Sequence, residues 1–213
     1  MESQLQYIKK KTEAMFWTSH DCEKTITTGE GKPCKKCKER YMEEESKREH
    51  AAFKDAKSRT ITLNPTDSEF ISMKTYFETH THRGYKALRI DKNNNIGLLQ
   101  RYNKAKSRND HQKEALLFHG TPQGHNHGNI FQNGFKLKYA RNGTLGVGIY
   151  FADDVDYSDS GYCFGTTIKG SEIRTIFICK VLFVPGQYIK NGNIQAIYKE
   201  DLCFPEYIVH YGR

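Results

Sequence analysis

The sequence predicts an α+β domain with a mostly antiparallel sheet. Segments with helical periodicity are concentrated before residue 111, whereas β-rich apolar runs joined by glycine-containing segments dominate after it. The length of 213 residues fits one catalytic-sized domain with a small appendage. We expect the appendage over residues 1–57 and the domain over residues 58–213.

The appendage has a charged sequence with little to bury. It reads as two helices joined by a polar loop over residues 18–33, and the second helix, about residues 35–57, has few large apolar side chains. Conformational entropy opposes the ordering of such a region by about 1 to 2 kcal/mol per residue. Another source of stability is therefore expected.

A zinc ion is one such source. Cys34 and Cys37 have the two-residue spacing of half a zinc site, and Cys22 lies upstream with His20 beside it, while His50 is an alternative fourth ligand. Metal binding supplies folding energy directly. The sequence favours a helical appendage with Zn²⁺ at His20, Cys22, Cys34 and Cys37, against the alternative of exposed thiols in a lysine-rich loop.

The first half of the domain is predicted to be mainly helical. Thr66 stands three residues before Glu69, the spacing of a capping box, so a helix is expected over residues 67–78. A strand over residues 85–90 and a second helix over residues 96–106 follow from their apolar periodicity.

The second half is predicted to form the strands of the sheet, at residues 115–119, 148–152, 174–183 and 207–211. Three segments there place a polar residue on an apolar strand. They are LLFHGTP with His119, GTLGVGIYFADD with Tyr150 and FPEYIVHY with Glu206. An unpaired buried polar group costs about 1 to 3 kcal/mol. Each of these residues is therefore either hydrogen-bonded in the core or facing a cleft.

In combination and in this order, the three segments resemble the catalytic domain of poly(ADP-ribose) polymerases, diphtheria-toxin-like ADP-ribosyltransferases with a His, Tyr, Glu triad. The similarity covers roughly residues 61–211 and leaves residues 1–57 outside. It implies a fold with split antiparallel sheets around a cleft for NAD⁺, which is the substrate. It also implies His119, Tyr150 and Glu206 as catalytic residues.

The resemblance further implies roles for single residues. Glu206 would bond the ribose 2′-hydroxyl, stabilise positive charge at C1′ and help to polarise the acceptor, and His119 would hold a ribose hydroxyl. The Gly120 backbone would clamp the nicotinamide amide, Thr121 would lie near the adenosine, and Tyr150 would lie against the nicotinamide ring. The implied NAD-binding set is completed by Phe151, Ala152, Ser158, Tyr162 and Lys136.

Three of these assignments leave alternatives open. Ser158 would bind the carboxamide and Tyr162 would stack on the nicotinamide, but their spacing is one residue longer than in polymerising members, so Ser160 or Tyr157 is an alternative. Lys136 would contact a phosphate, or it is an ordinary exposed lysine.

The expected activity is ADP-ribosyl transfer from NAD⁺ to a protein acceptor or to the chain itself. The retained Glu206 is compatible with polymer synthesis, whereas the short stretch of about twenty residues before PEYIV favours mono or short-chain transfer. The alternatives are a silent module that binds ADP-ribose or nucleic acid, and an RNA 2′-phosphotransferase, against which the Glu206 segment argues.

The composition indicates in which cellular environment the protein is expected and with which partners. The longest apolar run, residues 175–184, is half the roughly 20 residues that a bilayer crossing needs, so a membrane protein is not expected. Six cysteines and no signal-peptide pattern predict reduced thiols in the cytosol or nucleus, with an exported effector left open. Residues 58–110 carry 10 basic and 5 acidic groups, which leaves nucleic acid as a further partner. Oligomeric state is not predicted.

Overall fold

The computed structural model describes residues 60–124, 126–168 and 170–213. These residues belong to Ala52–Arg213, the second of the two units into which the chain divides. The predicted appendage and its four zinc ligands lie outside the described residues. Within the described ranges, no group of three or more His, Cys, Asp or Glu side chains could hold a metal ion.

Among the described residues, two α-helices lie before residue 111 and two lie after it. They are α3 (Ser68–Thr79), α4 (Ile96–Ser107), α5 (Asn126–Asn133) and α6 (Val155–Asp159), with 3-10 turns η2 (Leu137–Tyr139) and η3 (Glu200–Leu202). In the part of the chain that the structure describes, no helix is long and apolar enough to cross a membrane.

The strands form one large sheet and one short hairpin. They are β1 (Thr60–Thr62), β2 (Lys86–Asn93), β3 (Glu114–His119), β4 (Asn142–Gly143), β5 (Gly146–Val147), β6 (Ile149–Ala152), β7 (Phe164–Ile168), β8 (Ser171–Leu182), β9 (Tyr188–Asn191), β10 (Ile194–Ile197) and β11 (Cys203–Gly212).

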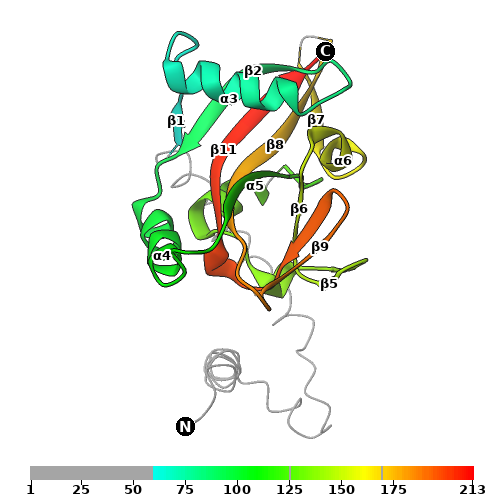
Figure 1. The fold of residues 1–213 in the computed structure, drawn as a ribbon. Coiled ribbons are helices and arrows are strands. Elements are labelled where there is room, and N and C mark those ends of the chain that lie inside the picture. The colour runs from blue at the N-terminus through cyan, green and yellow to red at the C-terminus, as the bar shows by residue number, and fades with distance from the viewer. Residues whose placement is uncertain (1–59, 125, 169) are drawn as a thin grey trace, which may run out of the picture. The chain divides into compact units, whose positions relative to one another are not determined.

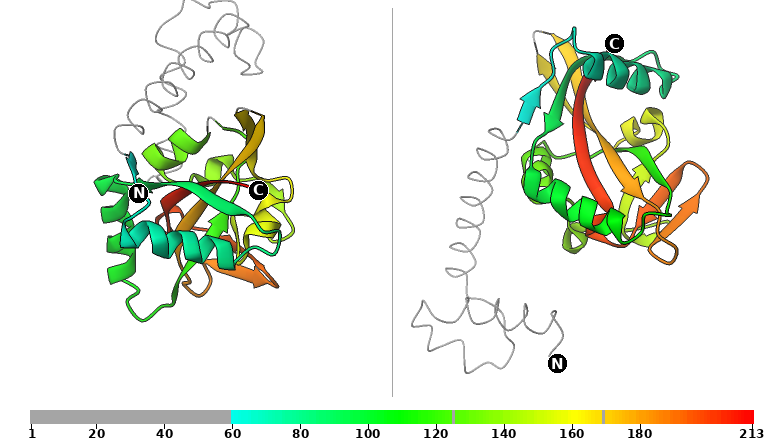
Figure 2. Two further views of the ribbon diagram at one scale, coloured as in Figure 1. Left: turned by 90° about the horizontal axis from the view of Figure 1, so that it is seen from above. Right: turned by 60° about the vertical axis from the view of Figure 1, so that its left-hand side comes forward.

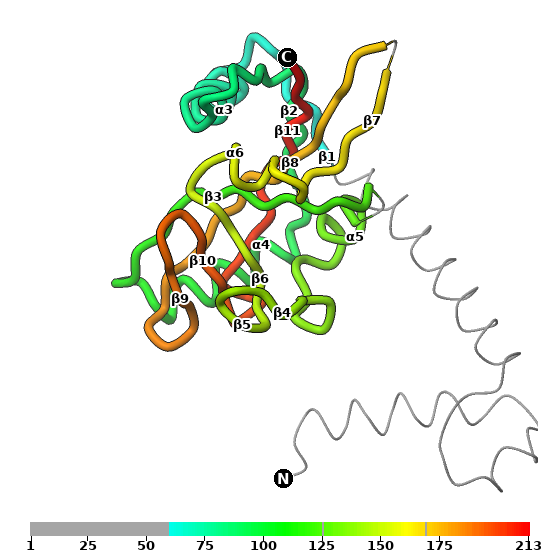
Figure 3. The backbone as a smooth tube through the Cα atoms, turned by 90° about the vertical axis from the view of Figure 1, so that its right-hand side faces the viewer, coloured from blue at the N-terminus to red at the C-terminus, as the bar shows by residue number. Residues whose placement is uncertain are grey.

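The sheet is antiparallel throughout the described residues, which confirms the predicted α+β class. Its strand order is β1-β2-β11-β8-β3-β6-β10-β9, with β7 beside β8, and β4 and β5 pair separately. The long strands β8 and β11 run side by side through its middle (Figures 1 and 2). The β7–β8 hairpin projects from the sheet (Figure 3).

The prediction of split sheets is wrong, because β3 and β6 pair with each other. These strands pair only at Phe118 and Ala152, yet that pair joins the two parts into a continuous nine-stranded sheet of described residues. The junction is narrow because β3 ends at His119, one residue beyond the pair. The two parts are therefore joined by hydrogen bonds, and Phe151 on one side and Phe177 on the other belong to the same hydrophobic core.

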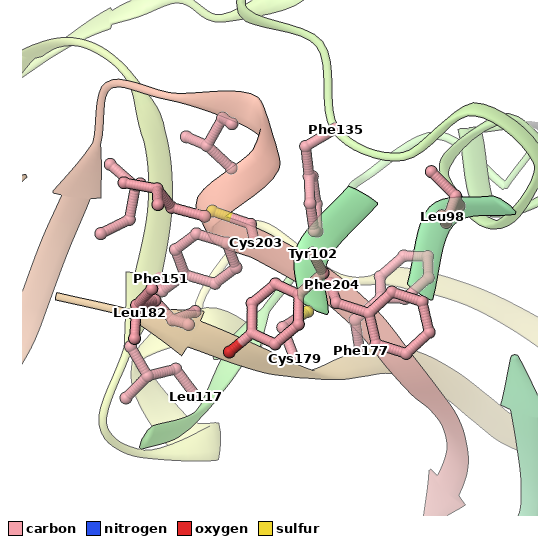
Figure 4. Close-up of a cluster of buried hydrophobic side chains, with 14 of the residues drawn as sticks. Leu98, Tyr102, Leu117, Phe135, Phe151, Phe177, Cys179, Leu182, Cys203 and Phe204 are labelled. Carbon is pink, nitrogen blue, oxygen red and sulfur yellow. The ribbon is translucent and has the colours of Figure 1, made fainter. Parts of the chain in front are cut away.

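Two hydrophobic cores lie on opposite faces of the central strands, as expected from the alternation of side chains along a strand. On one face, Phe70 and Phe77 of α3 pack with Ile176 and Ile178 of β8. On the other, α4 and α5 cover Phe177 and its neighbours (Figure 4). Both cores bury large aromatic and aliphatic side chains, and such burial contributes about 1.5 to 3 kcal/mol per residue.

The predicted capping box at the start of α3 is wrong. The N-cap is Asp67, and its side chain makes no capping hydrogen bond. The Thr66 amide is instead bonded to Asn64 Oδ1 at 3.0 Å, and Glu69 turns to the Tyr207 hydroxyl at 2.6 Å. Thr66 is thus part of the turn that precedes the helix, and Glu69 is used in tertiary structure.

Candidate active site

His119 ends β3 and is tied to the strand that carries Tyr150. Its Nδ1 lies 2.7 Å from the Tyr150 backbone oxygen, and a carbonyl can only accept, so Nδ1 carries the hydrogen. The ring is surrounded by Phe135, Phe151 and Phe177, with centroids at 4.8, 5.6 and 6.2 Å. In the neutral ring, Nε2 then has a lone pair that can accept a hydrogen bond from a hydroxyl group.

The same surroundings make stability depend on pH. Burial lowers the pKa of His119, and the hydrogen bond to the Tyr150 carbonyl opposes this only in part. An unfolded histidine has a pKa of about 6.5. As the pH falls from about 7.5 to 5.5, the unfolded chain therefore takes up a proton that folded His119 resists, and the free energy of unfolding decreases.

We expect His119→Gln to remove this contribution. Urea unfolding at pH 7.5 and 5.5 should show a larger loss of stability in the parent protein than in the variant, because glutamine does not titrate. The other histidines are common to both proteins and cancel in the difference. Equal losses would contradict a folded His119 that stays neutral at pH 5.5.

Tyr150 supports the β4–β5 hairpin with its hydroxyl group. The hydroxyl accepts from the Leu145 amide and donates to the Gly146 carbonyl, both at 2.7 Å. A Cβ added at Gly143 would lie 2.8 Å from the phenol carbon and oxygen, so the ring lies directly on that glycine. Because the hydroxyl is already engaged twice, the ring is the part of Tyr150 left for contact with a ligand.

Gly120 and Tyr162, two residues that the resemblance implies for NAD binding, lie close together. A Cβ added at Gly120 would lie 2.6 Å from the Tyr162 carbonyl oxygen and 3.0 Å from Cys163 Sγ. Tyr162 is half-exposed and lies nearly parallel to Tyr157, with ring centroids 6.1 Å apart at 15°. Ser158 is buried in α6 beside them. The structure thus leaves Tyr157 open as the alternative to Tyr162.

Replacement of Gly120 by alanine should lower the free energy of unfolding by about 1 to 3 kcal/mol, because its methyl group would press on backbone atoms that cannot rotate away. Gly97→Ala in α4 is the matched control, since its Cβ would make an ordinary 3.5 Å contact. That control should be neutral or more stable, as alanine favours helix. Thermal or urea unfolding measures both. Equal stability of the two variants would show that Gly120 has room.

The remaining NAD-binding candidates are buried or bonded to other side chains of the protein. Phe151 and Ala152 are buried in the sheet, which leaves mainly their backbone atoms for a ligand. Thr121 is also buried, and its hydroxyl accepts from Asn126 Nδ2 at 3.1 Å. Lys136 is paired with Glu200 at 3.0 Å, so a phosphate contact would require it to leave that carboxylate.

Glu206 faces a pocket of about 360 Å³ between α3 and the strands β3, β8 and β11. Its side chain is 11% exposed, and Oε1 accepts from Lys180 Nζ at 2.5 Å. The pocket is lined by Met73, Glu114, Ala115, Leu116, Lys180, Glu206 and Tyr207. Glu206 is therefore close to solvent-accessible space and not enclosed in the core.

The three triad candidates are not in direct contact. His119 faces the aromatic cluster around Phe177, whereas the Glu206 pocket lies on the side of the sheet that α3 covers. Two strand pairings, β3 with β8 and β8 with β11, separate the two residues. Among the described residues, no hydrogen bond joins Glu206 to His119 or Tyr150. The structure brings His119 and Tyr150 together and places Glu206 apart.

Two supporting residues were not predicted from the sequence. Lys180 is the partner of Glu206, and it could have been found by the rule that identified His119, since it too interrupts an apolar strand. Asp159 follows Ser158 and has a fully buried side chain that accepts hydrogen bonds from two arginines and two tyrosines. Its immediate neighbours, Ser158 and Ser160, are polar, so its position next to them does not mark it as buried.

Comparison with known proteins identifies relatives of this chain. The family model described as the poly(ADP-ribose) polymerase catalytic domain matches residues 67–201, which include His119 and Tyr150 and end before Glu206. A probable poly(ADP-ribose) polymerase of Dictyostelium discoideum is 25% identical over 177 residues, covering 71% of this chain and 52% of that protein. The chain thus spans about half the length of this curated relative.

The family match covers more than half of the chain, and it contains the strands β3 and β6 that hold His119 and Tyr150 side by side. It also contains Ser158 in α6 and, after that helix, Tyr162, whose carbonyl lies close to Gly120. The resemblance first seen in three short segments therefore extends over a continuous domain, and the chain belongs to the family of poly(ADP-ribose) polymerase catalytic domains.

Proposed function

We propose that this chain is an NAD⁺-dependent ADP-ribosyltransferase that modifies a protein acceptor or itself. The observation that supports this most directly is the placement of Glu206. In a family domain, this carboxylate lies on a central strand and faces a pocket of about 360 Å³. A carboxylate at such a place can stabilise positive charge that develops on a bound substrate.

The proposed reaction is a substitution at C1′ of the nicotinamide ribose. The bond from C1′ to the nicotinamide nitrogen breaks, and neutral nicotinamide leaves with the bonding electron pair. An oxygen or nitrogen lone pair of the acceptor forms the new bond to C1′, and the acceptor proton passes to Glu206 or to water. The transition state resembles an oxocarbenium ion, so an enzyme gains most by stabilising positive charge at that carbon.

In this proposal the other residues bind and orient NAD⁺. His119 Nε2 accepts from a ribose hydroxyl, which its Nδ1 bond to Tyr150 allows. The Gly120 backbone and Ser158 bind the carboxamide, and Tyr162 or Tyr157 stacks on the ring together with Tyr150. Because His119 and the Glu206 pocket lie on different sides of the sheet, the proposal requires the Glu206 segment to adjust when NAD⁺ binds.

We favour transfer of one or a few ADP-ribose units. The segment between β8 and β11 is occupied by the β9–β10 hairpin and η3, and these elements run directly into β11. This segment therefore contributes few residues beside Glu206 that could bind the end of a growing polymer. Mass spectrometry of the automodified protein gives the chain length and the acceptor residue.

Incubation of the purified full chain with labelled NAD⁺ tests the function. We expect label to appear on the protein and free nicotinamide to be released. A protein that binds ADP-ribose or nucleic acid but neither transfers label nor releases nicotinamide would instead be a silent module of the same family.

We further propose that residues 1–57 form a zinc-ordered appendage with His20, Cys22, Cys34 and Cys37 as ligands. The support is the ligand spacing and the scarcity of apolar side chains in this region. Elemental analysis of protein purified without added metal tests it. Zinc near one equivalent is expected, and less than a tenth of an equivalent would exclude this site. A reducing compartment, cytosolic or nuclear, would keep these cysteines out of disulfides and available to zinc.

A further inference from the structure

Glu206 occupies an irregular position in its strand. The register between β11 and β8 shifts between Pro205 and Tyr207, so Glu206 is the extra residue of a bulge. Pro205 pairs with Cys179, and Tyr207 pairs with the next residue, Ile178. A bulge changes the direction in which a side chain points and weakens the local ladder. The backbone thus directs Glu206 into the pocket beside Tyr207 but does not by itself fix its flexible side chain.

The side chain is held by Lys180 from the neighbouring strand. Lys180 pairs with Phe204 in the β8–β11 register, two residues before Glu206. Its ammonium group lies 2.5 Å from Glu206 Oε1, and the two side chains are 31% and 11% exposed. A charge-assisted bond of this length in a partly buried pocket restrains the carboxylate more strongly than an exposed ion pair would.

Glu206 differs from the other two carboxylates near the pocket. Glu69 accepts from the Tyr207 hydroxyl at 2.6 Å and pairs with Lys92 at 2.7 Å. Glu114 accepts from the Tyr102 hydroxyl at 2.6 Å and pairs with Lys106 at 2.9 Å. Glu69 and Glu114 also bond through one oxygen each, but that oxygen has two donors. Glu206 has one donor among the described residues, Lys180 on Oε1, and its Oε2 is the oxygen that we assign to a substrate hydroxyl.

We propose that Lys180 is a positioning residue for the reaction. It fixes Oε1 of Glu206, so that Oε2 is presented to the pocket in one orientation and stays available to the substrate. Lys180 does not touch the reacting atoms in this arrangement and acts through Glu206. The inference rests on the proposed transferase function, because it assigns Glu206 to the chemical step.

The test measures NAD⁺ turnover by Lys180→Met, Lys180→Arg and their combinations with Glu206→Gln. We expect Lys180→Met to lower kcat about tenfold or more with KM for NAD⁺ within twofold of the parent protein. Arginine keeps a cationic donor, so Lys180→Arg should recover most of the loss. In the Glu206→Gln background, Lys180→Met should cause little further loss, because the residue that it positions has already been changed.

Lys190→Met is the matched control. Lys190 is another strand lysine in an ion pair, with Asp153 at 2.7 Å, and it lies outside the Glu206 pocket. Its removal should leave kcat and KM unchanged. Unfolding curves of all variants separate a loss of folded protein from a loss of turnover.

The outcomes separate the inference from the function on which it rests. If the parent protein consumes NAD⁺ and Lys180→Met retains full kcat, the positioning role is wrong while the transferase function stands. The same conclusion follows if Lys180→Met lowers kcat by the same factor in the Glu206→Gln background as in the parent protein. If the parent protein neither transfers ADP-ribose nor releases nicotinamide, both proposals fail.

Discussion

Replacement of Asp159 by alanine should lower the free energy of unfolding by about 3 kcal/mol or more, the cost typical of removing one partner from a buried charge network. The Asp159 carboxylate accepts from Arg83, Tyr85, Arg174 and Tyr211 at 2.9, 2.9, 2.8 and 2.6 Å, and its side chain is fully buried. Burial by itself would raise the pKa of Asp159, but the bonds from Tyr211 and Arg174 outweigh it and lower the pKa. Without the carboxylate, two phenol groups would lose their acceptor in the core.

Urea unfolding of Asp159→Ala and of a control variant, Glu172→Gln, measures the effect. Glu172 also pairs with Arg174 at 2.9 Å, but its side chain is 60% exposed. The control should therefore change stability by no more than about 1 kcal/mol. A total stability of about 5 to 15 kcal/mol is typical of a domain, so the loss at Asp159 is a large share. Similar small effects at both positions would show that the buried network contributes little.

The sequence predicted the elements that depend on local periodicity. The helix expected over residues 67–78 is α3 (Ser68–Thr79), and the helix over residues 96–106 is α4 (Ile96–Ser107). Both have apolar side chains at helical spacing, and Asn95 caps α4 through the Leu98 amide. The last strand was expected over residues 207–211, yet β11 begins at Cys203. Strand pairing continues through the bulge at Glu206, and alternation of side chains alone cannot show such an irregularity.

The site was predictable only where a single segment carried the signal. His119, Tyr150 and Glu206 each stand out as polar residues on apolar strands, but the contact of His119 with the Tyr150 carbonyl depends on how β3 and β6 meet. The pairing of Lys180 with Glu206 likewise depends on the register of β8 against β11. Strand register depends on how two strands meet in the folded protein, and the sequence of either strand alone does not determine it.

Asp159 shows the same limit most clearly. Its four donors come from three separate parts of the chain, at residues 83 and 85, at residue 174 and at residue 211. Its neighbours in sequence, Ser158 and Ser160, give it the character of a surface loop. Only the folded arrangement of α6, β8, β11 and the segment just before β2 shows that the carboxylate is buried.

Glu206→Gln should reduce ADP-ribosyl transfer about a hundredfold or more, which corresponds to about 2.7 kcal/mol of transition-state stabilisation. Glutamine keeps the shape of the side chain and an oxygen that can still accept from Lys180 Nζ, so the variant should fold and bind NAD⁺ much as the parent protein does. It lacks the negative charge that would stabilise C1′ in the transition state. Single-turnover measurements with labelled NAD⁺, at substrate concentrations above and below KM, separate binding from the chemical step.

Glu114→Gln is the matched control, since Glu114 lines the same pocket but is paired with Lys106 at 2.9 Å and bonded to Tyr102. If charge in the pocket acted only as a general field, the two variants would lose similar activity. If Glu206 acts directly on the ribose, only Glu206→Gln should lose the hundredfold, with KM for NAD⁺ little changed. Near-parent turnover by Glu206→Gln would show that this carboxylate is not catalytic, and it would leave His119 and Tyr150 as parts of a binding site alone.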